Sequence, residues 1–143
     1  MATKVATDPA IIAGASHYCS MVAIATKTIF LQYRFPSMVW GAVLPAITIP
    51  SSGKYITRIN GTQREQNEFH ANWSRNTLKK VYGKAPETYV VIHDITDYGR
   101  GHAEYFISSI EKLGGKILGK MGITIGQEDM SAELTRAKAM KPD

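Results

Sequence analysis

The second half of the chain places a long helix pattern between two strand patterns. Residues 54–59 (KYITRI) alternate as a strand does, and residues 87–95 (ETYVVIHDI) form the clearest strand pattern in the sequence. Residues 60–65 hold an Asn-Gly turn and a capping box that opens a helix, and Gly83 is placed to end it. The buried face of this helix is expected to consist of Phe69, Trp73, Leu78 and Val81. A connection of that length is too long for a hairpin. The two strands are therefore expected to lie parallel in one sheet.

The first half repeats the helix and strand in shorter form. Residues 8–26 predict a helix, because Asp8 and Pro9 suit a helix start and apolar residues follow at helical spacing. Residues 28–35 (TIFLQYRF) predict a strand, and residues 43–49 a possible further one. Two β-α-β units result.

Two such units side by side predict an α+β fold in which a four-stranded mixed sheet carries both helices on one face. They form a single domain over residues 1–113, with repeat one at about 1–50 and repeat two at about 51–113. A short helix is expected near its end, and residues 114–143 are expected to be a helical tail or an arm that grips a neighbour. The uncovered face of the sheet favours self-association.

Composition limits the partners. Cys19 is the only cysteine among 143 residues, so an internal disulfide is impossible and a reducing, cytoplasmic compartment is expected. No stretch is apolar enough for a membrane span. The net charge of +5 is spread along the chain rather than clustered, which disfavours nucleic acid and suits a pocket for a small carboxylate.

Four polar residues at element ends are the candidate site: His17, Arg58, Arg64 and Asp97. Arginine binds a carboxylate through two parallel hydrogen bonds, histidine can orient a substrate, and aspartate can activate water or move a proton. The sequence has no phosphate-binding glycine loop, dinucleotide fingerprint or zinc spacing, so neither a cofactor nor a metal is expected.

Several short runs resemble the tautomerase superfamily, in its fused-repeat branch typified by cis-3-chloroacrylic acid dehalogenase. They cover about residues 8–113 and comprise residues 60–66, 83–87 and 89–95, His17 on the first predicted helix, and Asp97-Tyr98-Gly99-Arg100 followed by Glu104-Tyr105.

The resemblance implies a homotrimer that acts on a small unsaturated or 2-keto acid, by keto–enol tautomerisation or by hydrolytic dehalogenation or hydration. In it, His17 matches the helix-one histidine, Arg58 the first carboxylate-binding arginine, and Arg64 stands in for the second. Asp97 stands where that branch has a water-activating glutamate.

The amino terminus leaves alternatives open. The branch uses an amino-terminal proline, whereas this chain begins Met1-Ala2. One alternative is a non-catalytic trimeric binding or interaction module that keeps the fold without the proline. Another is an organelle-imported protein in which cleavage exposes Pro45.

Overall fold

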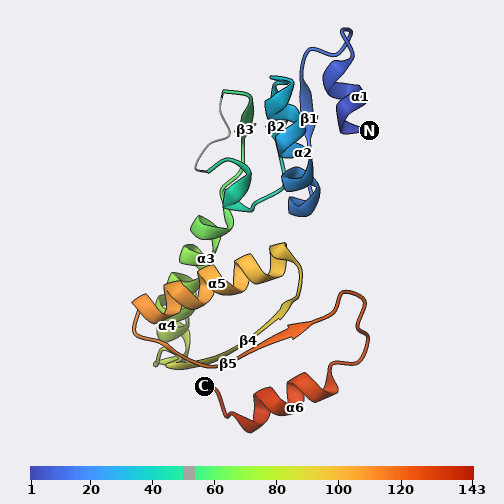
Figure 1. Cartoon of the computed structure of the whole chain (residues 1–143). Helices are drawn as coiled ribbons and strands as arrows, with labels where there is room; N and C mark the ends of the chain where they lie inside the picture. The colour runs from blue at the N-terminus through green and yellow to red at the C-terminus, as the bar shows by residue number, and fades with distance from the viewer. Residues whose placement is uncertain (50–53) are drawn as a thin grey trace. The chain divides into compact units, whose positions relative to one another are not determined.

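The chain divides into two compact units, residues 1–62 and residues 63–143. The computed structural model describes residues 1–49 and 54–143, so the predicted repeat boundary near residue 50 lies outside the described residues. Each unit is built from parallel strands joined by helices (Figure 1).

Unit 1 contains a three-stranded parallel sheet in the order β1-β2-β3. Its elements are α1 (Ala2–Thr7), β1 (Gly14–Ser16), α2 (Ser20–Gln32), β2 (Ser37–Val39), a 3₁₀ turn η1 (Pro45–Ile47) and β3 (Ile56–Arg58). Ser37 of β2 pairs with Gly14 on one side and Ile56 on the other. The core beneath the sheet is apolar and consists of Ala23, Phe30, Phe35, Val39, Ala42, Ile47 and Ile56.

Unit 2 is a β-α-β unit preceded by a long helix and followed by a shorter one. Its elements are α3 (Gln63–Asn72), which continues through a π-helical turn η2 (Trp73–Thr77) into α4 (Leu78–Tyr82), then β4 (Thr88–Asp94), α5 (Asp97–Lys112), β5 (Lys116–Ile123) and α6 (Ser131–Ala139). β4 and β5 pair in parallel from Thr88 with Lys116 to Asp94 with Ile123.

Helices cover both faces of the β4–β5 sheet, with α5 on one side and α6 on the other (Figure 1). Adjacent β5 residues show the two directions. Lys120 lies 3.8 Å from Glu104 of α5, whereas a Cβ atom at Gly119 would lie 2.6 Å from the sulfur of Met140 at the end of α6. Successive strand residues point to opposite faces, so the sheet is a central layer.

The predicted α+β fold with one four-stranded mixed sheet is therefore wrong. The described residues form two wholly parallel sheets of three and two strands. The strand predicted at 87–95 is present as β4, but it pairs with β5 and not with the strand predicted at 54–59. β5 lies within residues 114–143, which the sequence predicted to be a helical tail.

Three local predictions in unit 1 also fail. Asp8 accepts a hydrogen bond from Ala10 N in a tight turn after α1, so no helix spans 8–26. The predicted strand at 28–35 is mostly the end of α2, because helical geometry buries Phe30 in the core. Pro45 opens a 3₁₀ turn within the possible strand at 43–49.

The predicted end of the long helix of unit 2 is confirmed, but the helix buries a different face from the one expected. Gly83 ends the helix in the left-handed conformation, with φ of 80°. The apolar residues expected to line the helix, such as Phe69 and Trp73, are exposed. The buried face is mostly polar and consists of Gln63, Asn67, Ala71 and Ser74. In the part of the chain that the structure describes, no helix is long and apolar enough to cross a membrane.

Candidate functional site

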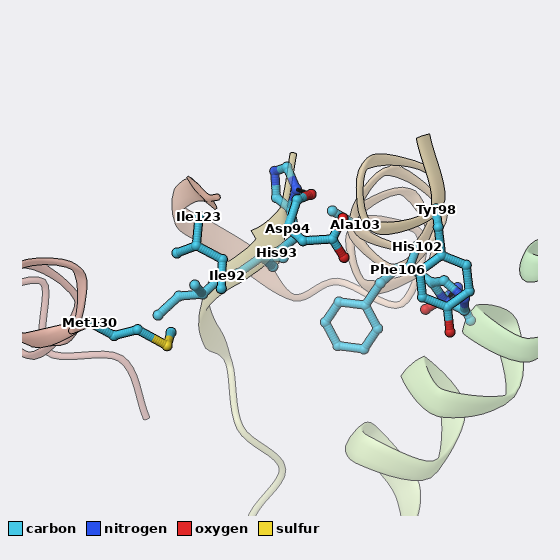
Figure 2. Close-up of a pocket in the computed structure, with 12 residues that line it drawn as sticks. Ile92, His93, Asp94, Tyr98, His102, Ala103, Phe106, Ile123 and Met130 are labelled. Atoms are coloured by element: carbon cyan, nitrogen blue, oxygen red, sulfur yellow. Dashed lines mark hydrogen bonds between the residues drawn. The ribbon is translucent and has the colours of Figure 1, made fainter. Parts of the chain in front are cut away.

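A pocket of about 480 Å³ lies in unit 2 beside the carboxyl end of β4 and the first turns of α5 (Figure 2). That volume suits a small organic molecule. The lining combines apolar side chains with a few polar ones: Asn67, Val91, Ile92, His93, Asp94, Tyr98, Gly99, His102, Ala103, Phe106, Ile123 and Met130. Ligands of parallel sheets bind beyond the carboxyl ends of strands, which is where this pocket lies.

Asp94 connects the end of β4 to the start of α5. Its Oδ1 atom accepts hydrogen bonds from the Thr96 hydroxyl and from Thr96 N, the latter at 2.9 Å. Thr96 caps α5, since its Oγ1 atom accepts from Gly99 N at 3.3 Å. The Thr96 hydroxyl, with help from the backbone N–H groups of Thr96 and Gly99, lowers the pKa of the Asp94 carboxyl. Asp94 therefore presents a negative charge to the pocket.

His102 presents a hydrogen-bond donor. The Asn67 side-chain amide donates to Gln63 O and to His102 Nδ1, both at 2.8 Å. An imidazole whose Nδ1 accepts carries its proton on Nε2 when neutral. Burial, followed by the charge of His70, lowers the pKa of His102, which keeps the ring neutral near pH 7. Its Nε2 atom is buried and has no hydrogen-bond partner among the described residues.

Tyr98 and the apolar wall complete the pocket. The Tyr98 ring contacts the His102 ring edge to face, with centroids 4.6 Å apart. Tyr98 O accepts from Gln63 Nε2 at 2.7 Å, which ties the first turn of α5 to α3. Figure 2 shows the Phe106 ring beneath α5, with Tyr98 and His102 to one side and Met130 to the other. The pocket thus offers an anion, a neutral donor and apolar surface together.

The four predicted site residues fall in both units. In unit 1, His17 lies in the loop after β1 and not on a helix. Its Nε2 atom is hydrogen bonded to Thr26 Oγ1 at 2.7 Å, and its ring stacks on Phe30. Burial lowers the pKa of His17.

Arg58 ends β3 and holds the loop that follows β2. Its guanidinium donates to Thr48 Oγ1 at 3.1 Å, to Ala42 O at 3.0 Å and to Leu44 O at 2.8 Å. Because Ala42 N also donates to His17 O, the structure brings His17 and Arg58 to the same loop. Arg58 fixes that loop in place.

The other two predicted residues lie in unit 2, outside the pocket lining. Arg64 pairs with Glu68 one turn along α3, at 3.2 Å between exposed side chains. Asp97 begins α5 and is exposed, next to Tyr98 in the sequence. Over residues 1–49 and 54–143, no cluster of three His, Cys, Asp or Glu side chains could hold a metal ion.

Sequence reasoning missed Asn67, Asp94 and His102. A signal for Asp94 was available, because an Asp at the end of the most apolar strand is followed by Thr96 and then by Gly99, as in a capped helix start. Asn67 and His102 are 35 residues apart in the sequence, so no local sequence pattern predicts their contact.

Comparisons with known proteins agree with this architecture. No protein-family model matches the chain. An amino acid binding protein of Pseudomonas aeruginosa is 26% identical over 140 residues, which cover 97% of this chain and 35% of that protein. The leucine-binding protein LivK of Thermotoga maritima superposes with a TM-score of 0.85 at 22% identity, over 99% of this chain and 38% of LivK.

A further solved structure resembles the chain and holds a different ligand. The solute-binding protein of an ABC transporter from Rhodopseudomonas palustris, in complex with 3,4-dihydroxybenzoic acid, has a TM-score of 0.78 at 19% identity. It is matched over 99% of this chain and 37% of that protein. The chain therefore has the α/β fold of part of a type I periplasmic binding protein, and it spans between a third and two-fifths of the relatives that it matches.

The resemblance to the tautomerase superfamily is thereby overturned. Both predictions that depend on that fold are wrong: tautomerisation or dehalogenation of an unsaturated or 2-keto acid, and a non-catalytic module that keeps the tautomerase fold. The expectation of an isomerase or lyase is also contradicted, since the similar proteins are described as binding proteins. The homotrimer and the cytoplasmic location stay predictions.

Proposed function

We propose that the chain is a ligand-recognition part of a solute-binding protein that takes a small carboxylate, an amino acid in the first instance. The observation that carries this proposal is the pocket at the carboxyl end of β4, which Asp94 and His102 both line, together with the buried His102 Nε2 atom, which has no hydrogen-bond partner among the described residues. The fold shared with amino-acid-binding and benzoate-binding proteins supports it.

The pocket chemistry suits both ends of an amino acid. A neutral His102 donates from Nε2 to a ligand carboxylate, which satisfies a donor that is otherwise buried without a partner. The ionised Asp94 attracts the ligand ammonium group. An aliphatic side chain would pack against Ile92, Phe106 and Met130.

Titration calorimetry of the 143-residue chain with leucine tests the proposal. His102→Ala removes the donor to the carboxylate and is expected to weaken binding about 10- to 100-fold. Asn76→Ala is the control, since Asn76 is an exposed polar residue of unit 2 outside the pocket lining. Leucine binding that is unchanged in His102→Ala, or absent from the folded chain for amino acids and other small carboxylates alike, would contradict the proposal.

A further inference from the structure

We infer that Asn67 is a positioning residue that fixes the hydrogen-bonding form of His102, so that the pocket selects a ligand group that accepts a hydrogen bond, such as a carboxylate. The inference rests on the proposed function and goes beyond it by giving a role to a residue of α3. Asn67 is 4% exposed, lines the pocket and contacts His102 of the neighbouring helix α5. Its amide is therefore placed to act on the ring and not on solvent.

The orientation of the Asn67 amide is set by the backbone of its own helix. Its Nδ2 atom lies 2.8 Å from the carbonyl oxygen of Gln63 and 2.8 Å from Nδ1 of His102. A carbonyl oxygen only accepts, so the amide nitrogen and not the amide oxygen must face Gln63. Rotating the amide by half a turn would place two oxygens against each other. The amide thus directs one N–H group to Gln63 and the other to His102.

This orientation determines which nitrogen of His102 carries the proton. Nδ1 faces a donor and must accept, so the neutral ring carries its proton on Nε2. A protonated ring would have a second hydrogen, at Nδ1, directed at the Asn67 N–H group, and the contact would become repulsive. Asn67 therefore disfavours the charged ring, as burial also does. The buried Nε2 atom, which has no partner among the described residues, is held as a donor.

Asn72 makes the same backbone contact without a histidine. Its Nδ2 atom donates to Glu68 O at 2.8 Å, one turn back along α3, just as Asn67 donates to Gln63 O. Asn72 is exposed and lies outside the pocket lining. Helix geometry accounts for the bond to the carbonyl in both residues, because side chains reach back one turn. The contact with His102 is the feature that distinguishes Asn67.

Other titratable groups face His102 from the elements packed against it. The charge of His70 on α3 disfavours the protonated ring, and the charge of Asp94 at the end of β4 favours it. His93 of β4 lines the same pocket, and Tyr98 of α5 packs edge to face on the ring. All four stay in place when only the amide that bonds Nδ1 is changed. A difference between variants at that one position therefore reports on the amide.

Calorimetric titration of the whole 143-residue chain with leucine as a function of pH tests the inference. Wild-type affinity is expected to stay within about threefold between about pH 5.5 and pH 7.5, because Nε2 donates throughout. In Asn67→Asp, the new carboxylate accepts from Nδ1–H, so a neutral His102 presents a lone pair at Nε2 to the ligand carboxylate. Leucine affinity in this variant should therefore fall about tenfold or more as the pH rises over the same range.

Asn72→Asp is the matched control. It adds the same charge to the same helix and removes the same kind of bond to a backbone carbonyl, but it lies outside the pocket lining. Its leucine affinity should follow the wild-type pH profile. A purely structural role for Asn67 would weaken leucine binding equally at every pH and would leave the profile of Asn67→Asp parallel to that of the control.

NMR of the side-chain nitrogens gives a second readout that needs neither ligand nor variant. In the free wild-type chain, scalar coupling across the N–H···N hydrogen bond is expected between Nδ2 of Asn67 and Nδ1 of His102, with the ring proton on Nε2. In Asn67→Asp, Nδ1 is expected to carry a proton. The wild-type coupling decides the matter even where Asn67→Asp does not fold.

Two results would overturn the inference alone. One is a leucine profile of Asn67→Asp that runs parallel to that of Asn72→Asp. The other is a wild-type His102 ring without coupling to Asn67, or with its proton on Nδ1. A folded wild-type chain that binds neither leucine nor any other small carboxylate would contradict the proposed function as well.

Discussion

A Cβ atom at Gly99 would lie 2.4 Å from the backbone oxygen of Asp94 and 2.4 Å from its Oδ2 atom. The first turn of α5 thus packs directly onto the residue that ends β4. This contact brings the Asp94 carboxylate to the pocket and places Tyr98 and His102 on the turns that follow. The site depends on a glycine that supplies space and no functional group.

Gly99→Ala is expected to destabilise the chain by about 1–3 kcal/mol, because backbone as well as side-chain atoms of Asp94 would have to move. Urea unfolding followed by circular dichroism measures this. Gly61→Ala is the control: a Cβ atom there meets nothing within 4 Å, so its effect should stay below about 1 kcal/mol. Equal costs at the two positions would refute the packing argument.

Thr96→Ala should cost about 1 kcal/mol, since it removes the cap of α5. The same change removes the hydroxyl that does most to lower the pKa of Asp94, so that pKa should rise toward its ordinary value. Thr96→Ser keeps the hydroxyl and should preserve both properties. Unfolding curves measure the stability, and an NMR titration of the carboxyl group measures the pKa. A Thr96→Ala variant with the same stability and the same Asp94 pKa as Thr96→Ser would contradict the capped arrangement.

Stability is expected to fall below about pH 6.5. The pKa values of His17 and His102 are both lowered from 6.5, burial being the main cause in each. Between the lowered and the ordinary pKa, the unfolded chain binds protons that the folded chain does not, so the stability present above about pH 6.5 is lost as the pH falls. The urea midpoint should accordingly be lower at about pH 5.5 than at about pH 7.5.

Replacing the two buried histidines separates their contribution to this pH dependence from that of other groups. His17→Asn and His102→Asn should each flatten the profile, whereas Trp73→Phe, at a half-exposed position and with no titrating group removed, should leave its slope nearly as it was. A slope that is insensitive to all three substitutions would show that these rings are not responsible.

The reversed face of α3 makes a further prediction. Ala71 is fully buried, so Ala71→Leu should overpack the buried face of α3 and cost about 1–3 kcal/mol. Phe69 is 66% exposed, and Phe69→Ser should change the unfolding free energy by less than about 1 kcal/mol. Thermal unfolding of the two variants gives the comparison. The opposite order would mean that the apolar face of the helix is the buried one.

Sequence patterns correctly predicted those features that depend on residues close to them in the chain. The left-handed Gly83 and the strand at Thr88–Asp94 are of this kind. Pairing was not predictable in the same way, because β4 selects β5 through the crossover by α5 and not through any feature of β4 itself. Phe30 illustrates a related error in predicting the secondary structure. The residues around it favour a strand by composition, but they form a helix that places the Phe30 ring in the core.

The candidate site was less accessible to sequence reasoning than the fold. Residues 97–100 were expected to be a loop after the strand, but they begin α5, and the side chains that line the pocket there are Asp94, Tyr98 and His102, and not Asp97. The role of His102 depends on Asn67, which reaches it from another helix. His17 was singled out for substrate chemistry, whereas its ring is hydrogen bonded to Thr26 and stacks on Phe30 within unit 1.

NMR of the isotope-labelled histidine rings tests the central claim most directly, because it reports on His102 Nε2 itself. In the free chain at neutral pH, His102 should be neutral with its proton on Nε2. Saturating leucine should shift the Nε2 resonance of His102 and leave that of the exposed His70 unchanged. A chain that binds leucine while the His102 resonances stay fixed, or a His102 ring protonated on Nδ1, would contradict the assignment of this pocket as the ligand site.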